Sequence, residues 1–141
     1  MTRVDFYILQ DNKAKALDQF ACRIAEKAYK QGHQVYINTS SDQQLEYLDD
    51  LMWTFRDGSF LPHDRYSNDH SSEQAVLLGY GIEPEGVDDV LLNLSDDIPA
   101  FFSRFKRVAE LVGGDDTARE SARARYRFYK DRGYTLNTHK L

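Results

Sequence analysis

Short apolar runs alternate with helically spaced apolar residues along the first part of the chain. Val4 to Leu9 is rich in β-branched and aromatic residues, which predicts a buried strand. Lys13 to Gln31 carries its apolar residues on one face of a predicted helix, and Gly32 is placed to end it. Gln34 to Asn38 predicts a second strand. A second helix is expected from Asp42, its predicted cap, to about Phe55.

The same alternation continues through the rest of the chain. Val76 to Tyr80 and Val90 to Leu94 predict two further strands. Ile98-Pro99 is expected to open a helix that continues to about Val112, because proline is favoured in a first turn. Gly113-Gly114 should break that helix, and the last helix should begin near Asp115. Strands alternating with helices indicate an α/β class with a parallel sheet, and 141 residues suit one domain, 1–141.

The composition is ordinary for a soluble globular protein, with 41% hydrophobic and 29% charged residues. No apolar run approaches the ~20 residues that a membrane helix needs, and the first residues lack the apolar core of a signal peptide. We therefore expect a cytoplasmic protein without a membrane contact. Cys22 is the only cysteine, and its place on the apolar side of the first helix predicts a buried structural thiol.

Charge is distributed unevenly along the chain. Seven of the 18 basic residues lie in the last 25 positions beside only Glu120 and Asp131, which gives this segment a net charge of +5. The other 116 residues carry 11 basic and 21 acidic groups, a net charge of −10. This division predicts a dedicated anion-binding surface on an otherwise acidic protein.

Helical spacing gathers much of this positive charge on one stripe of the last helix. The basic stripe consists of Arg119, Arg123, Arg127 and Lys130. The adjoining apolar stripe, which should face the body of the protein, consists of Ala118, Ala122, Tyr126 and Tyr129. A basic ridge edged by an aromatic ring suits a ligand that is both acidic and hydrophobic. The alternative is a solvated helix whose cations only complement its dipole.

The residues give no sign of catalysis, and we expect no enzymatic activity, metal or cofactor. The loop after the first strand, Gln10 to Lys13, has no glycine, whereas nucleotide-binding α/β domains need glycines there. Asp96 and Asp97 lie near a strand end, but capping of the predicted helix accounts for them. The histidines lack metal-ligand spacing and are expected to be surface or capping residues. They are His33, His63, His70 and His139.

Three blocks of the sequence together carry a family signature. Arg123 to Thr138 contains Arg-x-Arg-Tyr, then Tyr, then Gly-aromatic-x-Leu-Asn-Thr. Leu51-Met52-Trp53 is followed by Ser-Phe-Leu-Pro-His at 59–63, and Phe6 to Leu9 forms the first block. In this order and spacing the blocks resemble the bacterial DNA polymerase III chi subunit over roughly residues 4–138. The resemblance implies a single Rossmann-like α/β domain, with a mostly parallel sheet flanked by helices and a basic C-terminal helix.

The resemblance also implies a function. Chi is a non-catalytic accessory subunit of the replicase clamp-loader complex, and it binds the acidic C-terminal tail of single-stranded-DNA-binding protein. It also binds the psi subunit, so that it links the DNA polymerase III holoenzyme to coated single-stranded DNA and contacts DNA only indirectly. By this resemblance, Arg123 grips the terminal carboxylate of the tail, and Arg119, Tyr126 and Arg127 line the same pocket.

The second block is implied to face psi. Phe60, Leu61 and Pro62 match the psi-facing segment, and Trp53 either contributes to that face or is a core residue. Without the resemblance, Phe60 would be interpreted as a core residue. We expect the chain to be a monomer when psi is absent.

Besides the adaptor, the residues suggest two other functions. The basic C-terminal helix could bind single-stranded nucleic acid directly, with Tyr126, Phe128 and Tyr129 stacking on bases. The strongly acidic body argues against this, because it would repel a long phosphate backbone. A small α/β enzyme with an unfamiliar site has no support beyond the fold class.

Overall fold

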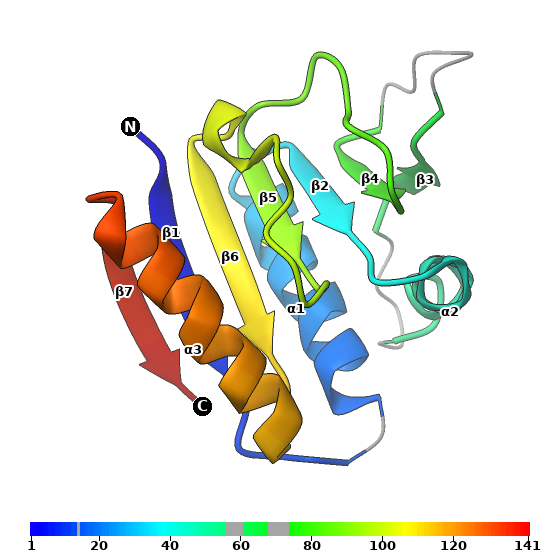
Figure 1. Cartoon of the computed structure of the whole chain (residues 1–141). Helices are drawn as coiled ribbons and strands as arrows, with labels where there is room; N and C mark the ends of the chain where they lie inside the picture. The colour runs from blue at the N-terminus through cyan, green and yellow to red at the C-terminus, as the bar shows by residue number, and fades with distance from the viewer. Residues whose placement is uncertain (14, 56–60, 68–73) are drawn as a thin grey trace.

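In the computed structural model, which describes residues 1–13, 15–55, 61–67 and 74–141, the strands form one seven-stranded parallel sheet (Figure 1). Neighbouring strands follow the order β3-β4-β2-β5-β6-β1-β7, and every pair is parallel. The strands are β1 (Arg3–Ile8), β2 (Val35–Asn38), β3 (His63–Arg65), β4 (Val76–Gly79), β5 (Val90–Asn93), β6 (Arg107–Val112) and β7 (Thr135–Lys140). The expected Rossmann-like α/β fold is confirmed.

Helices cover both faces of this sheet. On one face lie α1 (Ala16–Lys30) and α2 (Asp42–Leu51), and on the other lies α3 (Asp116–Asp131). In Figure 1, α3 crosses in front of β6, β1 and β7, whereas α1 lies behind the sheet. The remaining connection, between β5 and β6, contains a short 3-10 helix (Phe102–Arg104).

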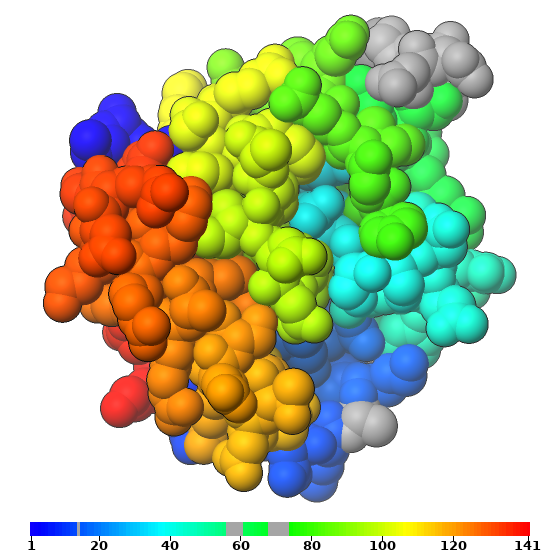
Figure 2. All heavy atoms as spheres, viewed as in Figure 1, coloured from blue at the N-terminus to red at the C-terminus, as the bar shows by residue number. Residues whose placement is uncertain are grey.

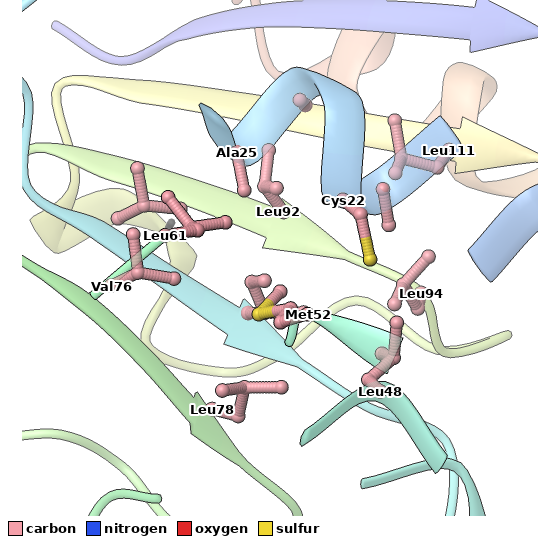
Figure 3. Close-up of a cluster of buried hydrophobic side chains, with 14 of the residues drawn as sticks. Cys22, Ala25, Leu48, Met52, Leu61, Val76, Leu78, Leu92, Leu94 and Leu111 are labelled. Atoms are coloured by element: carbon pink, nitrogen blue, oxygen red, sulfur yellow. The ribbon is translucent and has the colours of Figure 1, made fainter. Parts of the chain in front are cut away.

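Successive side chains of a strand point to opposite faces of the sheet, and they contribute to two hydrophobic cores, one on each face. In β1, Phe6 packs in the core under α3, whereas Tyr7 packs against the core under α1. Figure 3 shows the core under α1 and α2, where Cys22 lies among Leu94, Leu111 and Met52. Cys22 is fully buried, and this burial raises the pKa of its thiol to about 12, so the predicted structural thiol is confirmed.

The first two helices begin and end differently from the sequence-based expectation. α1 begins at Ala16 rather than near Lys13, because Lys15 has a left-handed backbone (φ 70°). The cap of α2 is Ser41, whose hydroxyl oxygen accepts a hydrogen bond from the Gln44 amide at 3.1 Å, and not Asp42. α2 ends at Leu51, a turn before Phe55.

The predicted helix from Ile98 to Val112 is wrong. Its second half is β6, which lies in the middle of the sheet between β5 and β1. A central parallel strand is buried on both faces, so β6 lacks the polar alternation that marks a surface strand. Glu110 carries a charge, yet its side chain is fully buried in the sheet.

Besides β6, two further strands were not anticipated. β7 pairs with β1 along its whole length and forms one edge of the sheet, and β3 forms the other edge. β7 is the more consequential of the two, because Phe6 faces Thr138 in the register and Ile8 faces Lys140. The side chains of Thr138 and Lys140 therefore lie on the same side of the sheet as α3.

Candidate functional site

A hollow of about 480 Å³ lies between α3 and the strands β1, β6 and β7. α3 begins directly after Asp115, whose carboxylate accepts a hydrogen bond from the Ala118 amide at 2.7 Å. Figure 2 shows that α3, in orange, forms much of one face of the molecule. The hollow therefore opens along the basic helix that the sequence singled out.

The floor of the hollow is apolar and aromatic. Tyr126 is 37% exposed, and its ring meets the buried ring of Phe6 edge-on, with centroids 5.4 Å apart. The other apolar lining residues are Ile8, Val112 and Ala122. An apolar side chain of a ligand could pack on this floor and be removed from water.

The polar part of the hollow carries three cations and no carboxylate. The cations are Arg119, Arg123 and Lys140, and the remaining polar lining residues are Gln10 and Thr138. Arg123 is exposed, and no hydrogen bond or ion pair joins its side chain to any described residue. An excess of cations over a half-apolar floor favours an anionic ligand with a hydrophobic part.

Arg119 has an unsatisfied donor. Its Nε is buried and has no hydrogen-bond partner among the described residues, and its Nη2 donates to Gln10 Oε1 only at 3.4 Å. A buried polar atom without a partner costs about 1–3 kcal/mol. An acceptor atom that entered the hollow would remove this cost, so Arg119 is poised for a ligand oxygen.

Gln10 reaches the hollow because the loop after β1 lies against the start of α3. Gly114 allows this approach: a Cβ at that position would lie 2.5 Å from the backbone oxygen of Asp11. A larger residue would push the two segments apart. The glycine pair that the sequence marked as a helix breaker therefore also shapes the site.

A buried polar network fixes how α3 lies on the sheet. Arg125 Nε lies 3.1 Å from Glu110 Oε1, and the Tyr129 hydroxyl donates to Glu110 Oε2 at 2.7 Å. Asn93 also donates to the Glu110 carboxylate. Burial raises the pKa of Glu110, while the Arg125 guanidinium and these hydrogen bonds act in the opposite direction. The network sets the rotation of α3 and thereby the direction of Arg119 and Arg123.

The structure brings together three of the four tail-binding residues expected from the sequence. Arg119, Arg123 and Tyr126 line one hollow, whereas Arg127 is exposed on α3 outside its lining. Sequence reasoning missed Lys140 and Thr138, which reach the hollow because β7 pairs with β1. The Leu-Asn-Thr signature was the available signal, since it marks the strand that carries both residues.

Three of the four expected psi-facing residues, Trp53, Leu61 and Pro62, lie at the far end of the sheet, near α2 and β3. Trp53 is 52% exposed, so it is not a core residue, and its ring lies 4.4 Å from the ring of His63. Leu61 is fully buried in the core, and Pro62 is half-buried. Phe60 lies outside the described residues.

His63 itself is buried, so the expected surface or capping role is wrong. Its Nε2 lies 3.1 Å from Asp49 Oδ1, and its Nδ1 lies 2.7 Å from the Leu61 carbonyl oxygen. These contacts tie β3 to α2 beneath Trp53. His70 lies outside the described residues.

The described part of the chain offers little other chemistry. It contains no group of three or more His, Cys, Asp or Glu residues that could hold a metal ion, and none of its helices is long and apolar enough to cross a membrane. Asp96 and Asp97 do not cap a helix, because none begins there. The backbone carbonyl of Asp96 instead accepts a hydrogen bond from Arg125 Nη1 at 3.2 Å.

The sequence of this chain is similar to those of known proteins over almost its whole length. The family model described as "DNA polymerase III chi subunit, HolC" matches residues 1–137. A DNA polymerase III subunit chi from Pseudomonas aeruginosa is 43% identical over 141 residues, which cover 100% of this chain and 98% of that protein. The subunit chi of Escherichia coli is 27% identical over 143 residues, covering 98% of this chain and 97% of that protein.

A solved structure shares the fold alone. The crystal structure of T4 UvsW matches with a TM-score of 0.71 and 8% identity, over 99% of this chain and 41% of that chain. At that identity the likeness concerns the sheet and its helices, not the function. By its family match and its curated relatives, the chain belongs to the DNA polymerase III chi subunit family and has its role in DNA replication.

Proposed function

We propose that this chain is a cytoplasmic, non-catalytic adaptor of the replicase clamp loader. In this proposal the hollow beside α3 binds the acidic C-terminal tail of single-stranded-DNA-binding protein, and the surface around Trp53 binds the psi subunit. The two surfaces lie on different elements, α3 with β7 and α2 with β3. One molecule can therefore hold both partners, and the replicase is joined to coated template.

The observation that carries the proposal is the buried, unpartnered Nε of Arg119 in a hollow with two further cations and an aromatic floor. A ligand that matches this hollow needs a carboxylate next to an apolar ring. A peptide that ends in phenylalanine after acidic residues has both features. Its terminal carboxylate lies against the guanidinium groups, and its ring packs on Phe6 and Tyr126.

The three cations have separable roles in this proposal. Arg123 is exposed and can form a bidentate contact with the terminal carboxylate. Arg119 supplies its buried donor to a peptide oxygen deeper in the hollow. Lys140 and, outside the lining, Arg127 attract the acidic residues that precede the terminus, a longer-range and weaker contribution.

The psi-binding part of the proposal rests on Trp53. A half-exposed tryptophan held against a buried histidine is a rigid apolar surface, and tryptophan is enriched at interface hot spots. Pro62 precedes His63, the residue on which Trp53 packs, and the family pattern adds Phe60 to the proposed psi surface. Leu61 supports this surface only from within the protein, because its side chain is fully buried in the core.

Direct binding of single-stranded nucleic acid remains the alternative use of α3. The chain has a net charge of −5, and the hollow holds only three cations, too few to follow an extended phosphate backbone. A confined hollow fits a short peptide end better. DNA is therefore contacted through the tail and not by α3 itself.

A binding assay with three probes tests the proposal. Fluorescence anisotropy would compare an acidic peptide ending in Pro-Phe as the free acid, the same peptide with an amidated end, and single-stranded DNA of equal charge. We expect the free acid to bind at least about 10-fold more tightly than the amide, because the amide removes the charge that the guanidiniums face. Equal binding of acid and amide, or tighter binding of the DNA, would contradict the proposed use of the hollow.

A further inference from the structure

A second groove lies on the opposite face of the sheet, between α1 and the strands β1 and β6. Its volume is about 420 Å³. α1 packs over β2 and β6, and β1 and β7 continue beyond it on this face (Figure 1). Because Asp5 and Tyr7 alternate with Phe6 along β1, the sheet itself separates this groove from the hollow beside α3.

The groove has a half-buried apolar wall. Tyr7 and Phe20 face each other with ring centroids 5.8 Å apart, and Ile24 and Ala28 extend this wall along α1. All four side chains are only partly buried. They offer an apolar surface to a ligand without any change in the fold.

The charged lining of the groove is dominated by cations. Among the Lys, Arg, Asp and Glu side chains of the lining, Arg23, Lys27 and Arg107 outnumber the single carboxylate of Asp5, an excess of two positive side chains on a protein of net charge −5. Asp5 is already engaged, because Arg107 lies 3.4 Å and His139 lies 3.1 Å from its oxygens. The carboxylate that could neutralise the groove is therefore occupied within β1, β6 and β7.

Within the groove lining, Arg23 and Lys27 are exposed cations that have no carboxylate partner among the described residues. They lie four positions apart on α1, so their side chains project from the same face at about 5–6 Å separation. In an extended peptide, residues n and n+2 lie about 6.6 Å apart on one side. Two carboxylates at alternate positions of such a peptide would therefore meet both cations at once.

We propose that this groove is a second docking surface, which takes an internal, extended acidic segment of a protein partner with an apolar side chain beside its carboxylates. The charge excess and the spacing of Arg23 and Lys27 select the acidic residues, and the wall of Tyr7, Phe20 and Ile24 takes the apolar one. A free terminal carboxylate is not required. This surface is independent of the proposed tail-binding hollow.

The test is an amide NMR titration of the Arg123→Ala variant, in which peptide binding at the hollow beside α3 should be weaker. The probe is a short peptide with alternating aspartates and one phenylalanine, acetylated and amidated at its ends. We expect the peptide to shift the amides of α1 around Arg23 and Lys27. Lys27→Glu and Arg23→Gln should each weaken this binding by at least about 5-fold.

Lys30→Glu is the control, since it makes the same charge change on α1 at an exposed residue outside the groove lining. It also breaks the 3.9 Å ion pair of Lys30 with Glu26, so a thermal melt checks that this variant is folded as the wild type is. The variant should leave the affinity within about 2-fold. Shifts confined to α3 and β7, or equal weakening by Lys27→Glu and Lys30→Glu, would overturn the proposal. Tighter binding of single-stranded DNA than of the peptide at the same α1 amides would also overturn it. The tail-binding proposal is judged separately, by the free-acid peptide on the wild type.

Discussion

Arg123 and Arg125 lie two positions apart in α3, but the first side chain is exposed and the second is buried. Arg125 is 6% exposed, and its guanidinium is paired with Glu110 inside the protein. Arg123 is exposed at the hollow, with no partner among the described residues. The Arg-x-Arg spacing thus provides one arginine that anchors the helix and one that remains available to a ligand.

Breaking the Glu110–Arg125 pair should destabilise the protein strongly. Glu110→Ala leaves the Arg125 guanidinium buried without its carboxylate, and such a loss typically costs about 3–5 kcal/mol. The double variant Glu110→Leu with Arg125→Met should recover much of that free energy of unfolding, because neither charge remains. Urea denaturation monitored by circular dichroism measures both. A double variant less stable than Glu110→Ala would show that the network contributes more than its paired charges.

Cys22 should be unreactive in the folded protein. Its raised thiol pKa, about 12, means that only a minute fraction is thiolate at pH 8.5, and the side chain is also fully buried. Reaction with a thiol reagent at that pH should therefore wait for unfolding and accelerate sharply in denaturant. Rapid modification of the native protein would show that the core under α1 opens readily.

Trp53 should act at an interface and not in the core. Trp53→Ala should weaken psi binding by about 2 kcal/mol or more, roughly 30-fold, while the melting temperature changes by only a few degrees. Leu61→Ala is the contrasting variant, because this fully buried side chain should cost about 2–5 kcal/mol of stability. Co-purification with psi and thermal melts of both variants give the two readouts. Unchanged psi binding by Trp53→Ala would contradict the proposal that psi binds the surface around Trp53.

Much of the fold was predictable because its signals are local. The strands near Val4, Gln34, Val76 and Val90 are compact apolar runs, and the basic helix has a clear cap at Asp115. β6 was not predictable from its own residues. Glu110 is compatible with a central strand only because Arg125, 15 positions later, neutralises it from α3.

The site was predictable in part for the same reason. Arg119, Arg123 and Tyr126 lie on adjoining stripes of one helix, so their proximity follows from helical spacing alone. Lys140 joins them only through the pairing of β1 with β7, and Gln10 joins them only because the loop after β1 packs against the start of α3. Both contacts link segments more than 100 positions apart. Non-local strand pairing leaves no periodic trace in the sequence. The lining residues outside α3 therefore could not be predicted from the sequence pattern.

Lys140 should contribute to tail binding although no sequence pattern marked it. Lys140→Ala should weaken binding of the acidic tail peptide by about 2- to 5-fold at low salt, and this difference should shrink as salt is added. Titrations at two ionic strengths measure the effect. An unchanged affinity at low salt would place the acidic residues of the tail away from β7.

The most direct measurement is titration calorimetry of a free-acid tail peptide with wild type, Arg123→Ala and Lys130→Ala at fixed ionic strength. Lys130 is the control, because it is an exposed cation of α3 outside the lining of the hollow. Loss of the charge-assisted contact of Arg123 should cost about 1.5–3 kcal/mol, a 10- to 150-fold weaker affinity, and Lys130→Ala should stay within about 3-fold of wild type. Equal affinities for wild type and Arg123→Ala would contradict the assignment of the hollow as the tail-binding site.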